Sequence, residues 1–287
     1  MPPRIAAVTM VYNEPDFLPL WRRHYTRLVG AEHCHVVDHG SDDGSTEGLG
    51  AINRLRLPRS PQDDPRRARF ISRFCAGLLE WYDWVIYTDV DELLIPDPRL
   101  HPDLATFCAE ARAEVIHAIG LNLHHLPEEA PFDVTRPLGP QRRWVRFSGA
   151  MCKPALIRRP VAWAPGFHGA DAPVTFAPLY LIHLRWFDHD VGLRRLAKTR
   201  AMPWADAAAA PWQRGPDEAF AALFSVFAAL PRLPVVDFSL AAPPIDGALA
   251  ALLATRERCA AGPYPFDLDF NIDALWPLPP RLRDALP

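Results

Sequence analysis

At 287 residues and 49% hydrophobic content, the chain can bury a substantial core, which excludes a largely disordered protein. The formal net charge is -3 with both signs interspersed, so the overall charge predicts no nucleic-acid partner. The five cysteines are widely spaced without a CxxC pair, a pattern typical of reduced thiols rather than of disulfides or a zinc knuckle. No stretch approaches the roughly 18 uncharged apolar residues of a membrane span. We therefore expect a cytoplasmic protein with at most peripheral membrane association.

The chain opens with an alternation of strand and helix signals. Ile5–Val11 is a continuous apolar run with β-branched members, as expected for a strand that is covered on both faces. Apolar residues then recur at helical spacing between Asp16, which can cap a helix, and Gly30, which can end one. Cys34–Asp38 has the composition of a second strand. Strand, helix and strand in this order predict a βαβ unit, and hence a parallel sheet with a right-handed crossover.

The pattern continues through the middle of the chain and then becomes helical. An amphipathic helix is expected over residues 66–82, and a buried strand over residues 84–88 follows it. Further strands are expected over residues 115–121, 144–147 and 180–184, and helices beyond Asp188 and over residues 218–229.

The 32 prolines stand mostly between apolar runs and form no PxxP tract, so they indicate loops. No internal repeat or low-complexity linker separates one part of the chain from another. The simplest division is a nucleotide-sugar-binding α/β domain over residues 1–200, with a helical, proline-rich C-terminal extension over residues 201–287 packed on it.

The strongest local signal for chemistry is the pair Asp89 and Asp91, which directly follows the strand over residues 84–88. Ligands of open α/β sheets bind beyond the carboxyl ends of strands, so these acids should line a crevice while Val90 packs back. Two such carboxylates can hold Mn2+ or Mg2+, which neutralises a diphosphate and the charge that develops when it leaves. An isolated DxD sequence is as readily a pair of solvated acids, so its context decides.

Asp38 ends the second predicted strand. In nucleotide-binding α/β folds, an acid at this position accepts hydrogen bonds from ribose hydroxyls. The glycine-rich turn that follows contains Asp42, Asp43 and Ser45, which serve equally well as turn or helix-capping residues.

Three segments taken together resemble the glycosyltransferases of family 2 and the related family 92, which share the fold called GT-A. The segments are Val11-Tyr-Asn-Glu14, Asp38 with its glycine-rich turn, and Asp89-Val-Asp-Glu-Leu-Leu94. The resemblance covers about the first hundred residues well and extends more thinly to about residue 200. It implies a Rossmann-like, mostly parallel sheet flanked by helices. It also implies contacts with the nucleotide, the diphosphate or the metal for Thr9, Val11, Asn13, Glu14, Asp38, Asp89 and Asp91.

The resemblance continues downstream at Lys153, His168 and His183, in an order that related sequences often show. It implies donor contacts for Lys153 and His168 and a third metal ligand in His183, since a neutral imidazole is an acceptable ligand for manganese. The residues by themselves also allow an ordinary surface lysine and a half-buried structural histidine. The sequence departs from the family pattern after His183, where Leu184-Arg-Trp stands in place of a tyrosine that usually follows directly.

An inverting transfer needs a carboxylate that takes the proton from the attacking hydroxyl. Asp171, Asp188 and Asp190 are candidates, and Asp171 is preferred because it follows a glycine-containing turn that can approach a ligand closely. Each of these acids could instead cap a helix or stand in a loop. Asp91 is expected to act in catalysis through the metal. Arg69 is a candidate for a phosphate contact, although a solvated helix face is the simpler explanation.

Together these signals predict a metal-dependent glycosyltransferase that moves a sugar from a UDP- or GDP-sugar to an acceptor hydroxyl, with inversion. A saccharide or lipid-linked acceptor in surface polysaccharide or glycolipid synthesis is the class-level expectation. Haloacid-dehalogenase-like phosphatases also carry DxD after a buried strand, but there the strand usually comes first in the chain. A sugar-phosphate nucleotidyltransferase would need a glycine-rich phosphate loop where Tyr12-Asn-Glu-Pro15 stands. A non-catalytic nucleotide-sugar-binding relative remains open, because a sequence does not measure turnover.

Overall fold

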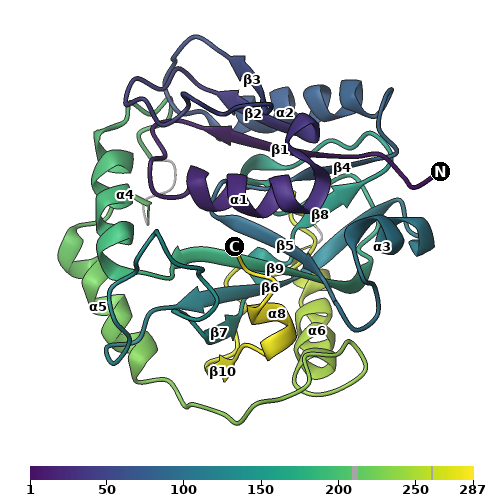
Figure 1. The fold of residues 1–287 in the computed structure, drawn as a ribbon. Helices are drawn as coiled ribbons and strands as arrows, with labels where there is room; N and C mark the ends of the chain where they lie inside the picture. Colours follow the sequence, from purple (N-terminus) through teal and green to yellow (C-terminus); the bar gives the residue numbers. More distant parts are fainter. Residues whose placement is uncertain (209–212, 260) are drawn as a thin grey trace.

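The computed structural model describes residues 1–208, 213–259 and 261–287. Their strands form a sheet in the order β10-β7-β6-β8-β4-β1-β2-β3, and β9 pairs with both β5 and β6 (Figure 1). Strand β1 (Ile5–Val11) lies between β2 (Cys34–Asp38) and β4 (Trp84–Tyr87), and both are parallel to it. The predicted βαβ unit is therefore confirmed.

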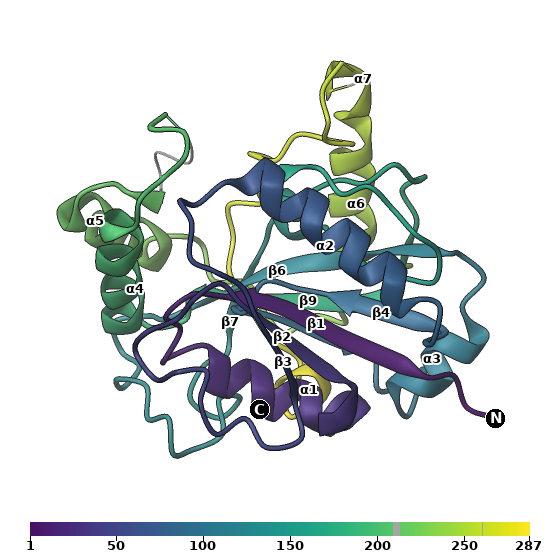
Figure 2. The same cartoon turned by 90° about the horizontal axis from the view of Figure 1, so that it is seen from above.

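Helices cover both faces of β1, which explains its unbroken apolar run. Ala7 packs in a core layer that includes residues of α1 (Leu18–Val29), whereas Val8 packs in a second layer with α2 (Asp64–Leu78). Figure 2 shows these two helices on opposite sides of the sheet. Because successive side chains of a strand point to opposite faces, both sets of β1 residues must be apolar.

The sheet is parallel at one end and mixed at the other. Strand β3 (Asn53–Arg56) extends the parallel block, and β6 (Val115–His124) runs parallel to β9 (Phe176–Trp186). The pairs β4–β8, β5–β9, β6–β7, β6–β8 and β7–β10 are antiparallel. The predicted α/β class, with a Rossmann-like sheet flanked by helices, is confirmed. The remaining strands are β5 (Glu92–Pro96), β7 (Trp144–Phe147), β8 (Pro154–Ile157) and β10 (Trp276–Pro277).

Helices α4 to α7 of the second half lie at two places around the sheet. Figures 1 and 2 show α4 and α5 together at one side, with α6 and α7 apart from them. Among the described residues, no helix has both the length and the apolar character needed to cross a membrane. The remaining helices are α3 (Leu104–Glu110), α4 (His189–Ala201), α5 (Asp217–Ala228), α6 (Ile245–Ala254), α7 (Arg256–Cys259) and α8 (Pro280–Arg283), with short 3-10 turns at Ala31–His33, Gly149–Met151 and Pro165–Phe167.

The last part of the chain packs into the same core as the first. Phe238 and Leu282 belong to the core layer that contains α1, and β10 pairs with β7. Asp97, which follows β5, accepts a hydrogen bond from Arg281 at 2.9 Å. The division at residue 200 remains a prediction, and residues 209–212 and 260 of the expected extension lie outside the described ranges.

The structure corrects several predicted elements. Asp16 does not cap α1, because Phe17 takes the N-cap position without a side-chain hydrogen bond and Asp16 pairs with Arg194 at 2.8 Å. Helix α2 begins at Asp64, where Asp63 caps it, and ends at Leu78. Strands β3, β5 and β8 were not predicted. The first is an exposed edge strand with polar residues, and β5 begins on the acidic residue Glu92, which hides its strand pattern.

Candidate functional site

A pocket of about 1170 Å³ lies beyond the carboxyl ends of β1 and β4. It is lined by residues of both strand ends and of β9, α4, α5 and the C-terminal segment. Asp89 and Asp91 line it, as predicted, whereas Val90 is buried in the core and also contributes to the lining. Ligand pockets have roughly 300–1,000 Å³, so this pocket is large enough for a drug-sized ligand.

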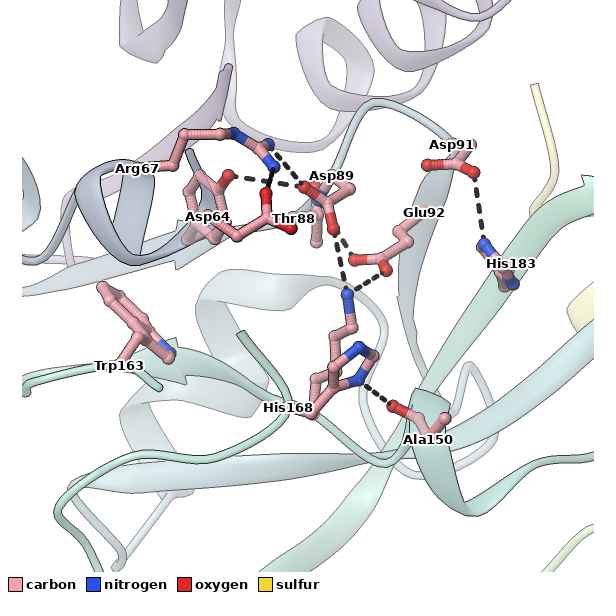
Figure 3. A network of polar contacts seen from close by, with 12 residues as sticks. Asp64, Arg67, Thr88, Asp89, Asp91, Glu92, Ala150, Trp163, His168 and His183 are labelled. Atoms are coloured by element: carbon pink, nitrogen blue, oxygen red, sulfur yellow. Dashed lines mark hydrogen bonds and ion pairs between the residues drawn. The ribbon is translucent and has the colours of Figure 1, made fainter. Parts of the chain in front are cut away.

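Asp89 belongs to an ion-pair group around Lys153. Its Oδ2 atom accepts a hydrogen bond from Lys153 Nζ at 3.0 Å, and its Oδ1 atom accepts one from Arg67 at 3.3 Å (Figure 3). Lys153 also pairs with Glu92, and these two side chains are only 5% and 2% exposed. The lysine charge is thus enclosed between two carboxylates, which excludes the alternative of an ordinary surface lysine.

The neighbouring charges of this group shift one another's pKa values. Burial by itself would raise the pKa of Asp89, but the cations of Lys153 and Arg67 lower it below its ordinary value. Burial raises the pKa of Glu92, and Lys153 offsets only part of this effect. Burial would lower the pKa of Lys153, yet the two carboxylates hold it above its ordinary value. Asp89 is therefore ionised at neutral pH and Lys153 is a fixed cation.

Asp91 faces a different partner, His183 (Figure 3). The Nε2 atom of His183 lies 3.1 Å from Asp91 Oδ2, and its Nδ1 atom lies 2.7 Å from Asn122 Oδ1. With Asn122 Oδ1 as the acceptor of the Nδ1 hydrogen, Nε2 either donates a proton to the Asp91 carboxylate or shares a cation with it.

The strand pairing explains this encounter. Strands β5 and β9 are antiparallel with Glu92 opposite His183, so the residue before Glu92 lies at the same sheet edge as the histidine. Burial by itself would raise the pKa of Asp91, but Arg195 and His183 hold it well below its ordinary value. Asp91 is therefore a permanently ionised carboxylate.

A second ion-pair group joins the end of β1 to helix α4, and we call it the α4 quartet: Glu14, Asp91, Arg195 and Lys198. Arg195 donates to Glu14 at 3.3 Å and, through its Nη2 atom, to Asp91 Oδ1 at 3.4 Å. Lys198 donates to Glu14 and, at 3.0 Å, to the carbonyl oxygen of Tyr12. Neither Arg195 nor Lys198 was predicted from the sequence. Their spacing of three residues on a predicted helix was the available signal, since it places both on one face.

The residues at this edge fit a divalent cation in part. Asp91 Oδ2 and, when it carries no proton, His183 Nε2 are two converging atoms that can ligate a cation, and Asn122 orients the ring as an outer partner of a metal-ligating histidine does. Within the described part of the chain, however, no group of three or more His, Cys, Asp or Glu side chains is arranged to hold an ion. Asp89 is bound by Lys153 and Arg67, and the guanidinium of Arg195 occupies the Asp91 carboxylate.

The structure brings seven of the predicted site residues to the pocket and leaves five outside it. Those that line the pocket are Val11, Glu14, Asp89, Asp91, Lys153, His168 and His183. Thr9, Asn13, Asp38, Arg69 and Asp171 are not among the residues that line it.

Asp38 is buried instead of open to a ligand. Its side chain has no exposed surface, and its carboxylate accepts hydrogen bonds from Arg54, Arg56 and Thr46 and from the backbone N–H of Ser41. The resemblance implied that Asp38 contacts the same donor as Asp89 and Asp91, but the structure places its carboxylate outside the pocket that those two acids line. Asp38 does stand at the end of β2, where nucleotide-binding folds place an acid. Its carboxylate is nevertheless bound by two arginines of β3, a strand that was not predicted.

The other four residues are held elsewhere for local reasons. Thr9 is fully buried within β1. Arg69 is exposed on α2, two positions beyond Arg67, which lines the pocket. Asn13 donates to Asp42 at 2.8 Å. Asp171 accepts a hydrogen bond from the backbone N–H of residue 162 at 2.7 Å, so its carboxylate serves a loop.

The remaining predicted acids have structural partners. Asp188 caps α4 and pairs with Arg142, and Asp190 pairs with His189. His168 lines the pocket, and its Nδ1 atom donates to the carbonyl oxygen of Ala150 at 2.7 Å (Figure 3). Burial, reinforced by the Lys153 charge, lowers the pKa of His168 to about 3, so the ring is neutral. Its Nε2 atom is then a hydrogen-bond acceptor.

The fold and the site define an α/β protein with ionised carboxylates at the carboxyl ends of its central strands. No protein-family model and no curated protein matches the chain. Solved structures that share part of the fold include glucosyl-3-phosphoglycerate synthase from Mycobacterium tuberculosis with Mn2+ and UDP-glucose, at 18% identity and a TM-score of 0.30 over 41% of this chain and 44% of that chain. Its complex with Mg2+ and UDP gives 18% identity and a TM-score of 0.31 over the same shares. The similarity thus spans less than half of either chain.

Proposed function

We propose that this protein is a metal-dependent glycosyltransferase that moves a sugar from a nucleotide-diphosphate sugar to an acceptor hydroxyl. The observation that carries the proposal is the convergence of Asp91 Oδ2 and His183 Nε2 in the pocket beyond the strand ends. A divalent cation bound there would neutralise the diphosphate and the charge that develops as it leaves. Membership of family 2 or family 92 remains a prediction.

The chain's own residues would hold the donor at the carboxyl edge of the sheet. Val11 and Tyr12 line the pocket at the end of β1, where the resemblance expects the nucleotide. On the other side of the Asp89 carboxylate, Lys153 and Arg67 add fixed cations that can meet phosphate oxygens. Asn122 orients the His183 ring toward Asp91.

Two carboxylates of the pocket are candidates for the base that activates the acceptor. Inversion, which we retain as part of the proposal, requires a carboxylate near the attacking hydroxyl. Asp267 and Asp269 line the pocket from the C-terminal segment, and they replace Asp171 as candidates because Asp171 is not in the lining.

The proposed acceptor is a saccharide or lipid-linked hydroxyl, in surface polysaccharide or glycolipid synthesis. Helix α5 supports an acceptor that carries an apolar group, because Phe220, Leu223 and Phe227 line the pocket. Leu223 is also 39% exposed, so this apolar lining reaches the surface. A cytoplasmic location, expected from the cysteine pattern, belongs to the same proposal.

The test is donor hydrolysis and transfer by the purified protein with a panel of UDP-, GDP- and dTDP-sugars, starting with UDP-glucose and Mn2+. We expect release of the nucleoside diphosphate that stops when EDTA is added and returns with Mn2+. Turnover that is unaffected by EDTA would contradict the metal dependence. Phosphate release from a phosphomonoester, without any nucleotide-sugar turnover, would favour the phosphatase alternative. Donor binding without turnover would favour the non-catalytic alternative.

A further inference from the structure

The α4 quartet is balanced in charge and poorly accessible to water. It contains two acids, Glu14 and Asp91, and two cations, Arg195 and Lys198. Their side chains are between 6% and 24% exposed. At such burial each charge depends on its partner, because an ion that is buried without a partner loses its hydration and gains nothing in return. In this structure the two cations of the quartet are therefore paired with its two acids.

This pairing conflicts with the proposed use of Asp91. Its carboxylate faces His183 on one side and the guanidinium of Arg195 on the other. A divalent cation between Asp91 and His183 would lie within a few ångströms of the Arg195 charge, and like charges at that distance repel strongly. A bare ion therefore meets a site whose negative charge is already neutralised.

A diphosphate removes the conflict. Arg195 and Lys198 are three residues apart, so they project from one face of α4, roughly 5–6 Å apart at their Cβ atoms. Both line the pocket beside Tyr12. This spacing suits two neighbouring phosphoryl groups, and the guanidinium fork matches phosphate oxygens in geometry.

We infer that Arg195 and Lys198 bind the diphosphate of the donor, in addition to the fixed cations Lys153 and Arg67, and that they leave Asp91 and Glu14 for the phosphate oxygens when donor and cation bind together. The inference rests on the proposed function. Its consequence is that cation and diphosphate bind cooperatively, each weakly without the other. Glu14 and Asp91 hold the two cations in place until the donor arrives.

The experiment measures binding by isothermal titration calorimetry for wild type, Arg195→Gln, Lys198→Met and the control Arg194→Gln. Arg194 is on the same helix, but it pairs with Asp16 and does not line the pocket. The probes are Mn2+ alone, inorganic pyrophosphate with Mn2+, and UDP and GDP with Mn2+. Urea unfolding of each variant establishes that it is folded.

We expect opposite effects in Arg195→Gln. Mn2+ alone should bind roughly tenfold more tightly, because one cation has left Asp91. Pyrophosphate and the nucleotides should bind roughly ten- to a hundredfold more weakly, the effect of one charge-assisted hydrogen-bonding group. Lys198→Met should weaken the binding of pyrophosphate and of the nucleotides by a similar factor. Arg194→Gln should behave as wild type.

Two results would overturn the inference. One is anion affinity in Arg195→Gln and Lys198→Met equal to that of the Arg194→Gln control. The other is parallel loss of Mn2+ and anion binding in Arg195→Gln, which would mean that the residue only supports the fold of the site. Binding of pyrophosphate that depends on Arg195, with no binding of any nucleotide, would uphold the inference and contradict the proposed function. Nucleotide binding that neither substitution changes would contradict the inference and leave the proposed function standing.

Discussion

His183 and Asp91 face each other across the edge of the sheet, with 3.1 Å between Nε2 and Oδ2. The two residues are far apart in the chain, and the antiparallel pairing of β5 with β9 brings them together. The other ring nitrogen of His183 is bound to Asn122, which fixes the direction of the ring. The relationship gives the proposed cation two ligands and an outer partner before any ligand binds.

Substitution of Asn122 tests this arrangement without removing a ligand. Asn122→Ala should weaken Mn2+-dependent nucleotide binding about 10- to 100-fold, because loss of an outer partner frees the ligand to rotate. His183→Ala should weaken it at least as much. The measurement is UDP affinity at saturating Mn2+, with His189→Ala as the control, since His189 pairs with Asp190 and does not line the pocket. Unchanged affinity in both pocket variants would contradict the proposed cation site.

Lys153 should be needed for stability as well as for the site. Lys153→Met leaves the buried Glu92 carboxylate unpaired and deprives Asp89 of one cation. Breaking a buried ion pair from one side destabilises by about 3–5 kcal/mol. Urea unfolding should show this loss. The double variant Lys153→Met with Glu92→Gln should recover part of it, and simple addition of the two single effects would argue against a coupled pair.

Asp38 should contribute to the stability of the fold and not to nucleotide binding. Asp38→Asn keeps the shape of the side chain but removes the charge that Arg54 and Arg56 share. We expect a loss of about 1–3 kcal/mol in the free energy of unfolding, as for a weakened charged hydrogen bond. UDP affinity of the folded variant, measured with Mn2+, should equal that of wild type. Lost affinity with unchanged stability would restore the ribose contact that the strand-end rule predicts.

Asp97 should make part of the stability depend on acid pH. Burial by itself would raise its pKa, but hydrogen bonds from Arg99 and Arg281 lower it to about 2 from an ordinary value of 3.8. A lowered pKa stabilises the folded state above the ordinary value, and this contribution, about 2 kcal/mol, is lost as pH falls from about 4 toward 2. Asp97→Asn should lack it. Urea unfolding at pH 7, 5, 4 and 3 should show the gap between wild type and variant narrow at the lowest pH, and a constant gap would contradict the assignment.

The sequence predicted the elements whose causes are local. The apolar run of Ile5–Val11 requires cover on both faces, and the structure supplies α1 and α2 there. The acids after the strand at Trp84–Tyr87 predicted a pocket at the strand ends, and Asp89 and Asp91 line one. Lys153, His168 and His183 line the same pocket, as the order of segments implied. Hydrophobic spacing and strand-end position were sufficient for these predictions.

Only the tertiary structure decided which charges meet. Arg195 reaches Asp91 across 104 positions of sequence, and the docking of α4 beside the end of β1 makes that contact. Asp38 is withdrawn from the pocket because β3 lies beside β2 with its arginines against the carboxylate. The spacing of apolar residues in a sequence indicates which side chains are buried. Which side chain a buried charge contacts depends on strand register and helix docking, which are set by the packing of the whole core and have no local signal.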